Sequence, residues 1–218
     1  MREIKVSLDS QGFHSKPTNQ VAAISKRIAR EKKVLNSLSA MTKFATDVGC
    51  NGHTFCPATF KNEERKKENF EQQQLFVLDF DNQEPKNTVS IDEVKARAAK
   101  YELPIFFTYD TFSSINHNKF RVVFMNDIPI QDRIVAEAMQ LALGTIFPEA
   151  DASCYKDVSK MYFGSNSMEN YYIDENIAEI NIESLFRNLC YYFENRYKKN
   201  HYKERIAKFS KQTSVVYH

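Results

Sequence analysis

Apolar residues alternate with polar ones in some parts of this chain and recur at helical spacing in others, which divides the sequence into predicted strands and helices. Alternating or continuous apolar runs predict strands at residues 4–8, 75–80, 105–112, 120–125 and 160–164. Apolar residues three to four positions apart predict helices at residues 18–35, 36–48, 91–101 and 132–147, and from 182 onward. Strands and helices thus occur together along the whole chain.

Several element boundaries carry their own signals. Ser90 and Glu93 have the spacing of a capping box, which predicts the start of the third helix. Gly49 suits the left-handed position that ends a helix. Residues 51–70 are rich in Gly, Pro, Asn and charge, and predict an irregular connection leading into the central strand at Leu75. Residues 105–112 and 120–125 together predict a hairpin.

The order of these elements predicts an α+β fold with a mixed or antiparallel central sheet flanked by helices. We expect one main domain over residues 1–180. Residues 181–218 begin as an amphipathic helix and become strongly basic after Arg196. We interpret their end as an exposed tail that would join a further domain in a longer protein.

Composition narrows the class of protein. The chain has 218 residues, 42% of them hydrophobic, with 17 Phe and 11 Tyr against 5 Gly and 6 Pro, which is typical of a globular protein. The net charge of +2 does not by itself indicate nucleic-acid binding, although basic clusters at 26–33, 65–67 and 196–211 suit a polyanionic partner. The sequence shows neither a signal peptide nor a membrane-length apolar stretch, so we expect a cytoplasmic protein without a membrane partner.

Four irregularly spaced cysteines favour a reducing compartment over a disulfide framework. Cys50, His53 and Cys56 are close enough in sequence to suggest zinc ligands. They lack a paired C-x-x-C half-site and a clear fourth ligand, so buried or loop thiols are the simpler interpretation.

Two carboxylates lie at the end of an otherwise wholly apolar strand. Successive side chains of a strand point to opposite faces, so Asp79 and Asp81 share one face with Leu75 and Val77. Ionised carboxylates at the end of a buried strand are costly unless a cation or a basic partner compensates them. The pair therefore suggests a metal site, and the alternative is a pair of solvated turn residues before Asn82.

A basic pair lies on the predicted second strand of the hairpin. Lys119 and Arg121 share one face of residues 119–124, and an Arg among apolar residues needs an anion. A phosphate matches the planar guanidinium well. An internal ion pair between Arg121 and an Asp is the alternative interpretation. Further acids and bases follow at residues 151–160, ahead of the predicted strand at 160–164.

Together these segments resemble the archaeo-eukaryotic primase superfamily, and in particular the primase-polymerase domains of plasmids, phages and other mobile elements. The resemblance spans residues 49–165, and its most specific matches are 51–58, 76–82, 119–124 and 157–164. Its three motifs are an acidic pair after a hydrophobic strand, a small hydroxyl followed by a basic strand residue, and a later single acid.

The resemblance implies a role for each matching residue. Asp79 and Asp81 would be metal ligands, and Ser113 would open the second motif. The superfamily commonly has His at the basic strand position, whereas this chain has Arg121, with His117 displaced into the preceding loop. We take Arg121, beside Lys119, as the phosphate-binding replacement and keep His117 as a secondary candidate.

The third motif leaves two candidates for the single acid. Asp151 precedes Ser159 and Lys160 at the expected interval, and we favour it as the third metal ligand. Asp157 is the competitor, and its position suits a local cap or ion partner. Lys160 resembles a residue that contacts the phosphates of the incoming nucleotide.

The activity that the resemblance implies is template-directed primer synthesis on single-stranded DNA, from nucleoside triphosphates, with two Mg²⁺ or Mn²⁺ ions. A helicase, in cis or in trans, is the implied partner. The alternative is a noncatalytic module that binds single-stranded nucleic acid or regulates replication with a primase-like fold. A rolling-circle nicking enzyme is excluded because it needs a His-hydrophobe-His metal motif, and no H-x-H occurs in the chain.

Overall fold

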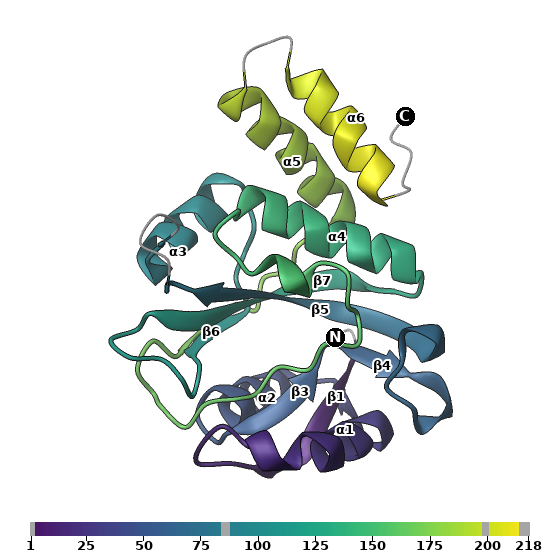
Figure 1. Ribbon diagram of the computed structural model, residues 1–218, viewed down its shortest axis with the longest axis vertical. Coiled ribbons are helices and arrows are strands. Elements are labelled where there is room, and N and C mark those ends of the chain that lie inside the picture. The colour runs from purple at the N-terminus through teal and green to yellow at the C-terminus, as the bar shows by residue number, and fades with distance from the viewer. Residues whose placement is uncertain (1–2, 84–87, 198–200, 214–218) are drawn as a thin grey trace.

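The computed structural model of the protein describes residues 3–83, 88–197 and 201–213. Its strands form two antiparallel sheets with helices packed on them, which confirms the predicted α+β class (Figure 1). The predicted single central sheet is replaced by a three-stranded sheet of order β2-β1-β3 and a five-stranded sheet of order β4-β5-β7-β6-β8. The strands are β1 (Ile4–Gly12), β2 (Lys32–Leu35), β3 (His53–Cys56), β4 (Ala58–Phe60), β5 (Phe70–Asp81), β6 (Phe107–Asp110), β7 (Lys119–Ile130) and β8 (Tyr172–Ile173).

The helices lie on either side of the five-stranded sheet. They are α1 (Val21–Arg30), α2 (Leu38–Gly49), α3 (Ile91–Lys100), α4 (Arg133–Ile146), α5 (Ile182–Arg196) and α6 (Tyr202–Thr213). In Figure 1, α3 to α6 lie above the five-stranded sheet, while the three-stranded sheet with α1 and α2 lies below it. No helix within the described ranges combines the length and the apolar composition that a bilayer crossing requires.

The central strand β5 separates two hydrophobic cores. Phe76 and Leu78 belong to the core that the five-stranded sheet forms with α3, α4, α5 and α6. Leu75 and Val77 belong to the core shared with the three-stranded sheet and α2. We call the side of the five-stranded sheet that carries Leu75 and Val77 its inner face. This burial on both sides explains why residues 75–78 of β5 are all apolar.

One edge of β5 is completed by segments other than a strand. β4 pairs with β5 only at its beginning, up to Gln73. Farther along, the side chain of Gln140 in α4 donates to the Val77 carbonyl over 2.7 Å. The Asp79 carbonyl then accepts a hydrogen bond from the Asp151 backbone N–H over 2.8 Å. The loop after α4 is thereby attached to the acidic end of β5.

Several predicted helices and the hairpin agree with the structure. The capping box at Ser90 and Glu93 is present at the start of α3. The helix predicted at 132–147 is α4, which Asp132 caps through the backbone N–H groups of Ile134 and Val135. β6 and β7 form the predicted antiparallel pair.

The N-terminal third differs from the prediction at short elements. The helix predicted at 18–35 ends at Arg30, and Lys32–Leu35 form β2 beside β1. Residues 51–70, predicted to be irregular, contain β3 and β4. These strands have only three or four residues, too few to show a period, and their hydrogen-bond partners are distant in sequence.

The predicted left-handed residue after α2 is also different. Gly49 is the last helical residue of α2. The left-handed glycine is Gly52, with φ of 73°. A Cβ atom there would lie 1.8 Å from the Phe13 carbonyl oxygen. Both the positive φ and this close approach therefore require glycine at position 52.

Two C-terminal predictions require correction as well. The predicted strand at 160–164 forms only an isolated bridge between Tyr162 and Phe55. The basic segment after Arg196 is not simply an exposed tail, because α6 packs Phe209 into the core with 3% of its surface exposed. Residues 214–218 lie outside the described part of the chain, and the domain division at residue 180 stays a prediction.

Candidate functional site

The charged end of the inner face opens into a pocket of about 160 Å³. Its walls come from the ends of β5 and β7 and from nearby loops, including the loop after β6. The lining residues are Lys16, Asp79, Phe80, Asp81, Thr111, Phe112, Ser113, Lys119, Arg121, Asp151 and Phe163. The structure therefore brings Asp79, Asp81, Ser113, Lys119, Arg121 and Asp151 of the predicted set together.

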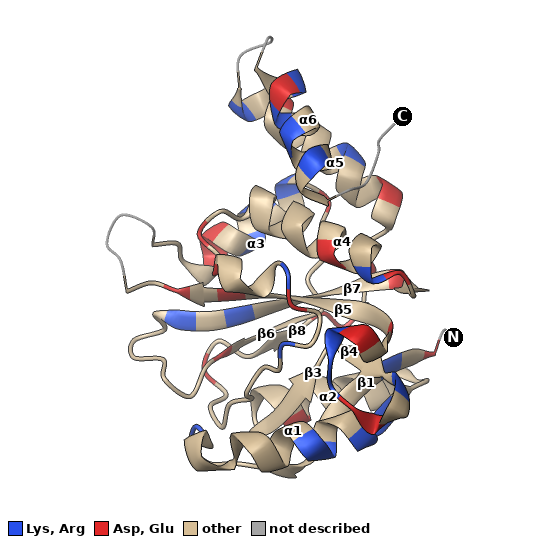
Figure 2. Cartoon of the chain, turned by 45° about the vertical axis from the view of Figure 1, so that its right-hand side comes forward, with Lys and Arg blue, Asp and Glu red and all other residues tan. Residues whose placement is uncertain are grey.

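The predicted acidic and basic pairs face each other across β5 and β7. Asp79 lies opposite Arg121 in the strand register, and Asp81 lies opposite Lys119. Figure 2 shows this arrangement as acidic segments at the end of β5 beside basic segments of β7. Because neighbouring antiparallel strands place opposed side chains on the same face, both ion pairs lie on the inner face.

Arg121 forms a partly buried ion pair with Asp79. Its Nη2 lies 3.1 Å from Asp79 Oδ2, and its Nη1 donates to the Phe163 carbonyl over 2.5 Å. Burial lowers the pKa of Arg121, but the Asp79 carboxylate and Tyr109 outweigh it and hold that pKa above its usual value. Burial also raises the pKa of Tyr109 to about 12. Arg121 therefore stays charged, and the internal pairing considered for it is present.

Arg121 retains one donor for a further acceptor. Its Nε–H is buried and has no hydrogen-bond partner. A buried donor without an acceptor costs free energy, and an anion entering the pocket could relieve that cost.

Asp81 and Lys119 form a more exposed pair. Asp81 Oδ2 lies 3.1 Å from Lys119 Nζ, and 47% of the Asp81 side chain is exposed, against 17% for Asp79. The two acids thus share a face but differ in surroundings.

Asp151 reaches the pocket from the loop after α4. Its carboxylate accepts hydrogen bonds from the backbone N–H and hydroxyl of Ser153, at 2.8 and 2.5 Å. Lys160 Nζ lies 3.5 Å from Asp151 Oδ2. Burial raises the pKa of Asp151, but these partners outweigh it and lower that pKa overall. The carboxylate is therefore held in its ionised form.

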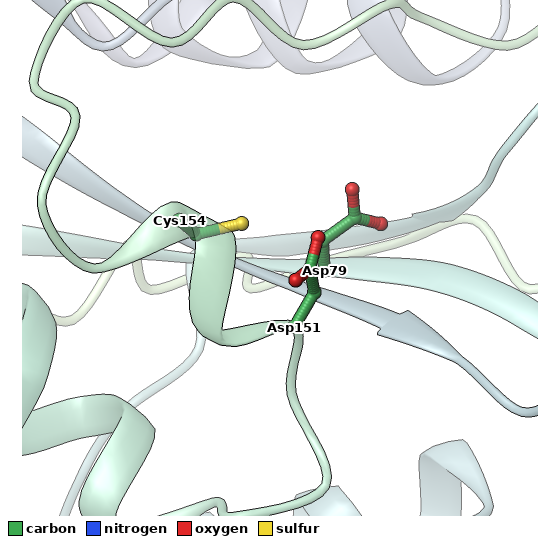
Figure 3. A group of neighbouring side chains, drawn as sticks. All are labelled: Asp79, Asp151 and Cys154. Carbon is green, nitrogen blue, oxygen red and sulfur yellow. The ribbon is translucent and has the colours of Figure 1, made fainter.

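Cys154 joins Asp79 and Asp151 in a group that sequence reasoning missed. One ligand atom from each of the three residues lies within 4.8 Å of the others. Figure 3 shows the two carboxylates next to each other, with the Cys154 sulfur extending toward them from a short helical turn. Two carboxylates and a thiol fit a divalent cation, and Asp81 does not belong to this group.

Three predicted residues occupy other surroundings. His117 Nδ1 lies 2.6 Å from Asp110 Oδ2, and His117 does not line the pocket. The Asp157 carboxylate accepts from the backbone N–H and hydroxyl of Ser159. Lys160 contacts Asp151 but lines a neighbouring small cavity together with Asp157.

The suggested zinc ligands do not converge. His53 Nδ1 bonds the Asp9 carbonyl at 2.9 Å, and the Cys56 thiol donates to the Val158 carbonyl. Within the described residues, the group formed by Asp79, Asp151 and Cys154 is the one set of three that could hold a metal ion. Cys50 and Cys56 are therefore a partly buried and a buried thiol.

Lys16 also lines the pocket, although no motif in the sequence marked it. It lies in the loop between β1 and α1, and only the folded chain brings it to the acids. Cys154 did have a weak signal, because a residue three positions after Asp151 lies beside it in a helical turn.

Comparisons with known proteins give one structural likeness. No family model and no curated protein matches the chain. Among solved structures, the AEP domain of the cyanophage S-2L primase-polymerase (PrimPol) is similar, with 8% identity and a TM-score of 0.45. The match covers 86% of this chain and 88% of that chain. At this identity and TM-score we transfer no residue role from that domain.

Proposed function

We propose that the pocket at the end of β5 and β7 catalyses template-directed nucleotidyl transfer and that the protein is a DNA primase or primase-polymerase. The proposal rests on one observation: the carboxylates of Asp79 and Asp151 lie together, and Arg121 and Lys119 line the same pocket. Acids for a divalent cation and bases for phosphates are the two parts that such a reaction needs. The resemblance of residues 49–165 to primases supports the same reaction.

Asp79 and Asp151 would hold the metal, and Asp81 would contribute from the more exposed side. Bound Mg²⁺ or Mn²⁺ ions would lower the pKa of the attacking hydroxyl and neutralise charge on the pyrophosphate leaving group. The donor set fits such ions because two of its members are carboxylates in a partly buried pocket.

Arg121, Lys119 and Lys160 would bind the triphosphate. Each of these cations now pairs with an acid, Arg121 with Asp79, Lys119 with Asp81 and Lys160 with Asp151. When a nucleotide enters with its cations, the bases can turn to phosphate oxygens while the acids turn to metal. Arg121 suits this exchange, since its free Nε–H can donate to a phosphate without breaking a bond. Ser113 lines the pocket beside them and can donate its hydroxyl.

The substrates would be nucleoside triphosphates and a single-stranded DNA template. Binding of the template would depend on salt and hardly on sequence, because its contacts would be made to phosphates. We further propose a cytoplasmic role in replicating a mobile element, with a helicase acting in cis or in trans.

One observation favours a noncatalytic module that binds single strands. The three acids of the pocket are already compensated by three cations of the protein, so the pocket balances its charge without metal. A protein that only binds nucleic acid could retain such a pocket as structure.

A primer-synthesis assay tests the proposal. The protein would be incubated with single-stranded DNA and labelled ribo- or deoxynucleotides, in Mg²⁺ or Mn²⁺. We expect labelled products from the natural protein and none from Asp79→Asn. Absence of products under both metals, with binding to single-stranded DNA retained, would favour the noncatalytic module.

A further inference from the structure

The position of Cys154 beside the two carboxylates, where it lines the neighbouring small cavity, follows from a single helical turn. Asp151 precedes the turn and Cys154 ends it, with the Cys154 backbone N–H donating to the Asp151 carbonyl over 3.2 Å. The turn places the sulfur back over the Asp151 carboxylate and beside Asp79 (Figure 3). Only 2% of Cys154 is exposed, so its thiol is fixed in place.

We propose that the Cys154 sulfur is the third protein ligand of the metal site formed by Asp79 and Asp151, and that the site therefore binds thiophilic divalent cations such as Zn²⁺ and Co²⁺. The proposal deepens the proposed function, because it concerns the same site. Three protein ligands leave further positions open for water or a phosphate oxygen, which is the arrangement of catalytic zinc sites.

A purely structural role for the Cys154 thiol does not explain the surroundings of its sulfur. Cys56 is a buried thiol of that kind, since its sulfur donates to a backbone carbonyl. Cys154 instead lies 3.0 Å from the Lys160 ammonium, which donates to the sulfur. Burial raises the pKa of Cys154, and the Lys160 ammonium offsets this only in part, so the sulfur rests as a thiol whose proton a metal ion would displace.

The consequence concerns which metal the site selects. Mg²⁺ prefers oxygen ligands, whereas sulfur favours softer ions. On binding, the sulfur–hydrogen bond is replaced by a sulfur–metal bond, and the proton leaves to solvent without any change in oxidation state. The site should then bind Co²⁺ and Zn²⁺ through Cys154, and Mg²⁺ largely through the carboxylates.

The test is a titration with Co²⁺ followed by its thiolate charge-transfer absorption. The matched variants are Cys154→Ser and Cys190→Ser, since Cys190 lies on α5 outside the pocket. We expect the absorption band in the natural protein and in Cys190→Ser. In Cys154→Ser the band should be lost and the affinity for Co²⁺ should fall at least about tenfold, while the affinity for Mg²⁺ changes little.

Two further variants test whether the absorption band comes from the site formed by Cys154 and Asp79 and not from another thiol. Asp79→Asn should weaken the band, because the carboxylate shares the ion with the sulfur. Lys160→Gln should preserve or strengthen it, because the ammonium no longer competes for the sulfur. Circular dichroism would establish that each variant is folded before its titration is compared.

A band that survives Cys154→Ser would overturn the proposal. So would a natural protein that binds Mn²⁺ in an Asp79-dependent manner but gives no band with Co²⁺. Failure of the enzymatic proposal is a different result, in which the Cys154-dependent band is present but no primers are made.

Discussion

The inner face of the five-stranded sheet has an apolar half and a charged half, built from the same strands. In the apolar half, Val77 lies opposite Val123, which lies opposite Phe107. Two residues farther along β5, Asp79 lies opposite Arg121, which lies opposite Tyr109. The first row is covered by the core that contains α2. In the second row, Asp79 and Arg121 line the pocket, while Tyr109 stays buried in that core.

The difference shows that two neighbouring rows of the same strands can have different roles. One row stabilises the fold, and the next can bind a ligand. Where another layer covers the sheet, the row excludes water and contributes hydrophobic free energy. Where the cover ends, the same row can present charges to a ligand. Substitutions in the two halves should therefore change different measurements.

The largest effect is expected from Asp79→Asn. The change removes a ligand charge and the partner of a buried Arg, and we expect primer synthesis to fall at least about 100-fold, or about 3 kcal/mol in activation free energy. Initial rates at equal concentrations of folded protein measure it. Asp81→Asn is the control from the more exposed pair, with an expected loss of about tenfold, or about 1.4 kcal/mol. Equal losses would break the distinction between the two acids.

The second test separates Asp151 from Asp157. We expect Asp151→Asn to reduce Mn²⁺ affinity and primer synthesis nearly as strongly as Asp79→Asn, because Asp151 lies in the group of three ligands. Asp157→Asn should leave both within about twofold, because its carboxylate only caps Ser159. Metal titration by electron paramagnetic resonance measures the affinity. A larger effect of Asp157→Asn than of Asp151→Asn would assign the role of third metal ligand to Asp157.

The apolar half is tested by Val77→Ala. Removing two buried methyl groups should lower the free energy of unfolding by about 2 kcal/mol. Urea denaturation measures this loss. Primer synthesis per folded molecule should be unchanged, and a specific loss of activity would mean that the two halves are not separable.

Arg121→Lys should weaken nucleotide binding about tenfold, because an ammonium lacks the planar set of donors that the guanidinium presents. Affinity for single-stranded DNA should change less, since Arg121 lies in the pocket and not on the outer basic surface. Fluorescence binding titrations with a nucleotide and with a DNA strand measure the two. Parallel losses would contradict this division.

The smallest effect concerns His117, outside the pocket. The pKa of His117 is raised, chiefly by its hydrogen bond to Asp110 and further by the charges of Asp110 and Glu169. A raised pKa in the folded state means that the protonated ring stabilises the fold fully below its unfolded pKa of about 6.5. This contribution is lost as pH rises through the folded value. His117→Gln should therefore lower stability at pH 5 but not at pH 9, as thermal unfolding would measure. The same loss at both values would exclude a charged His117.

Local patterns predicted the parts of the site that lie on long strands. The common face of Asp79 and Asp81, and that of Lys119 and Arg121, follows from the period of two along a strand. That these two pairs face each other could not be predicted, because it depends on the register of β5 against β7.

The missed features depend on contacts between distant segments. β2, β3 and β4 are short, and their backbone partners in β1 and β5 decide them more than their own residues do. Lys16 follows β1 of the three-stranded sheet, so it reaches the pocket only because that sheet packs against the five-stranded one. Cys154 was not among the predicted site residues, because only the turn after Asp151 places it beside the acids.

The attachment of the loop after α4 to β5 has a consequence for solubility. A strand with free backbone N–H and C=O groups at its edge can pair with another chain and aggregate. Beyond β4, the carbonyls of Val77 and Asp79 on this edge are occupied by the Gln140 side chain and the Asp151 backbone. The residue whose carboxylate we place in the metal site thus also helps to protect the central strand β5 from pairing with a second molecule.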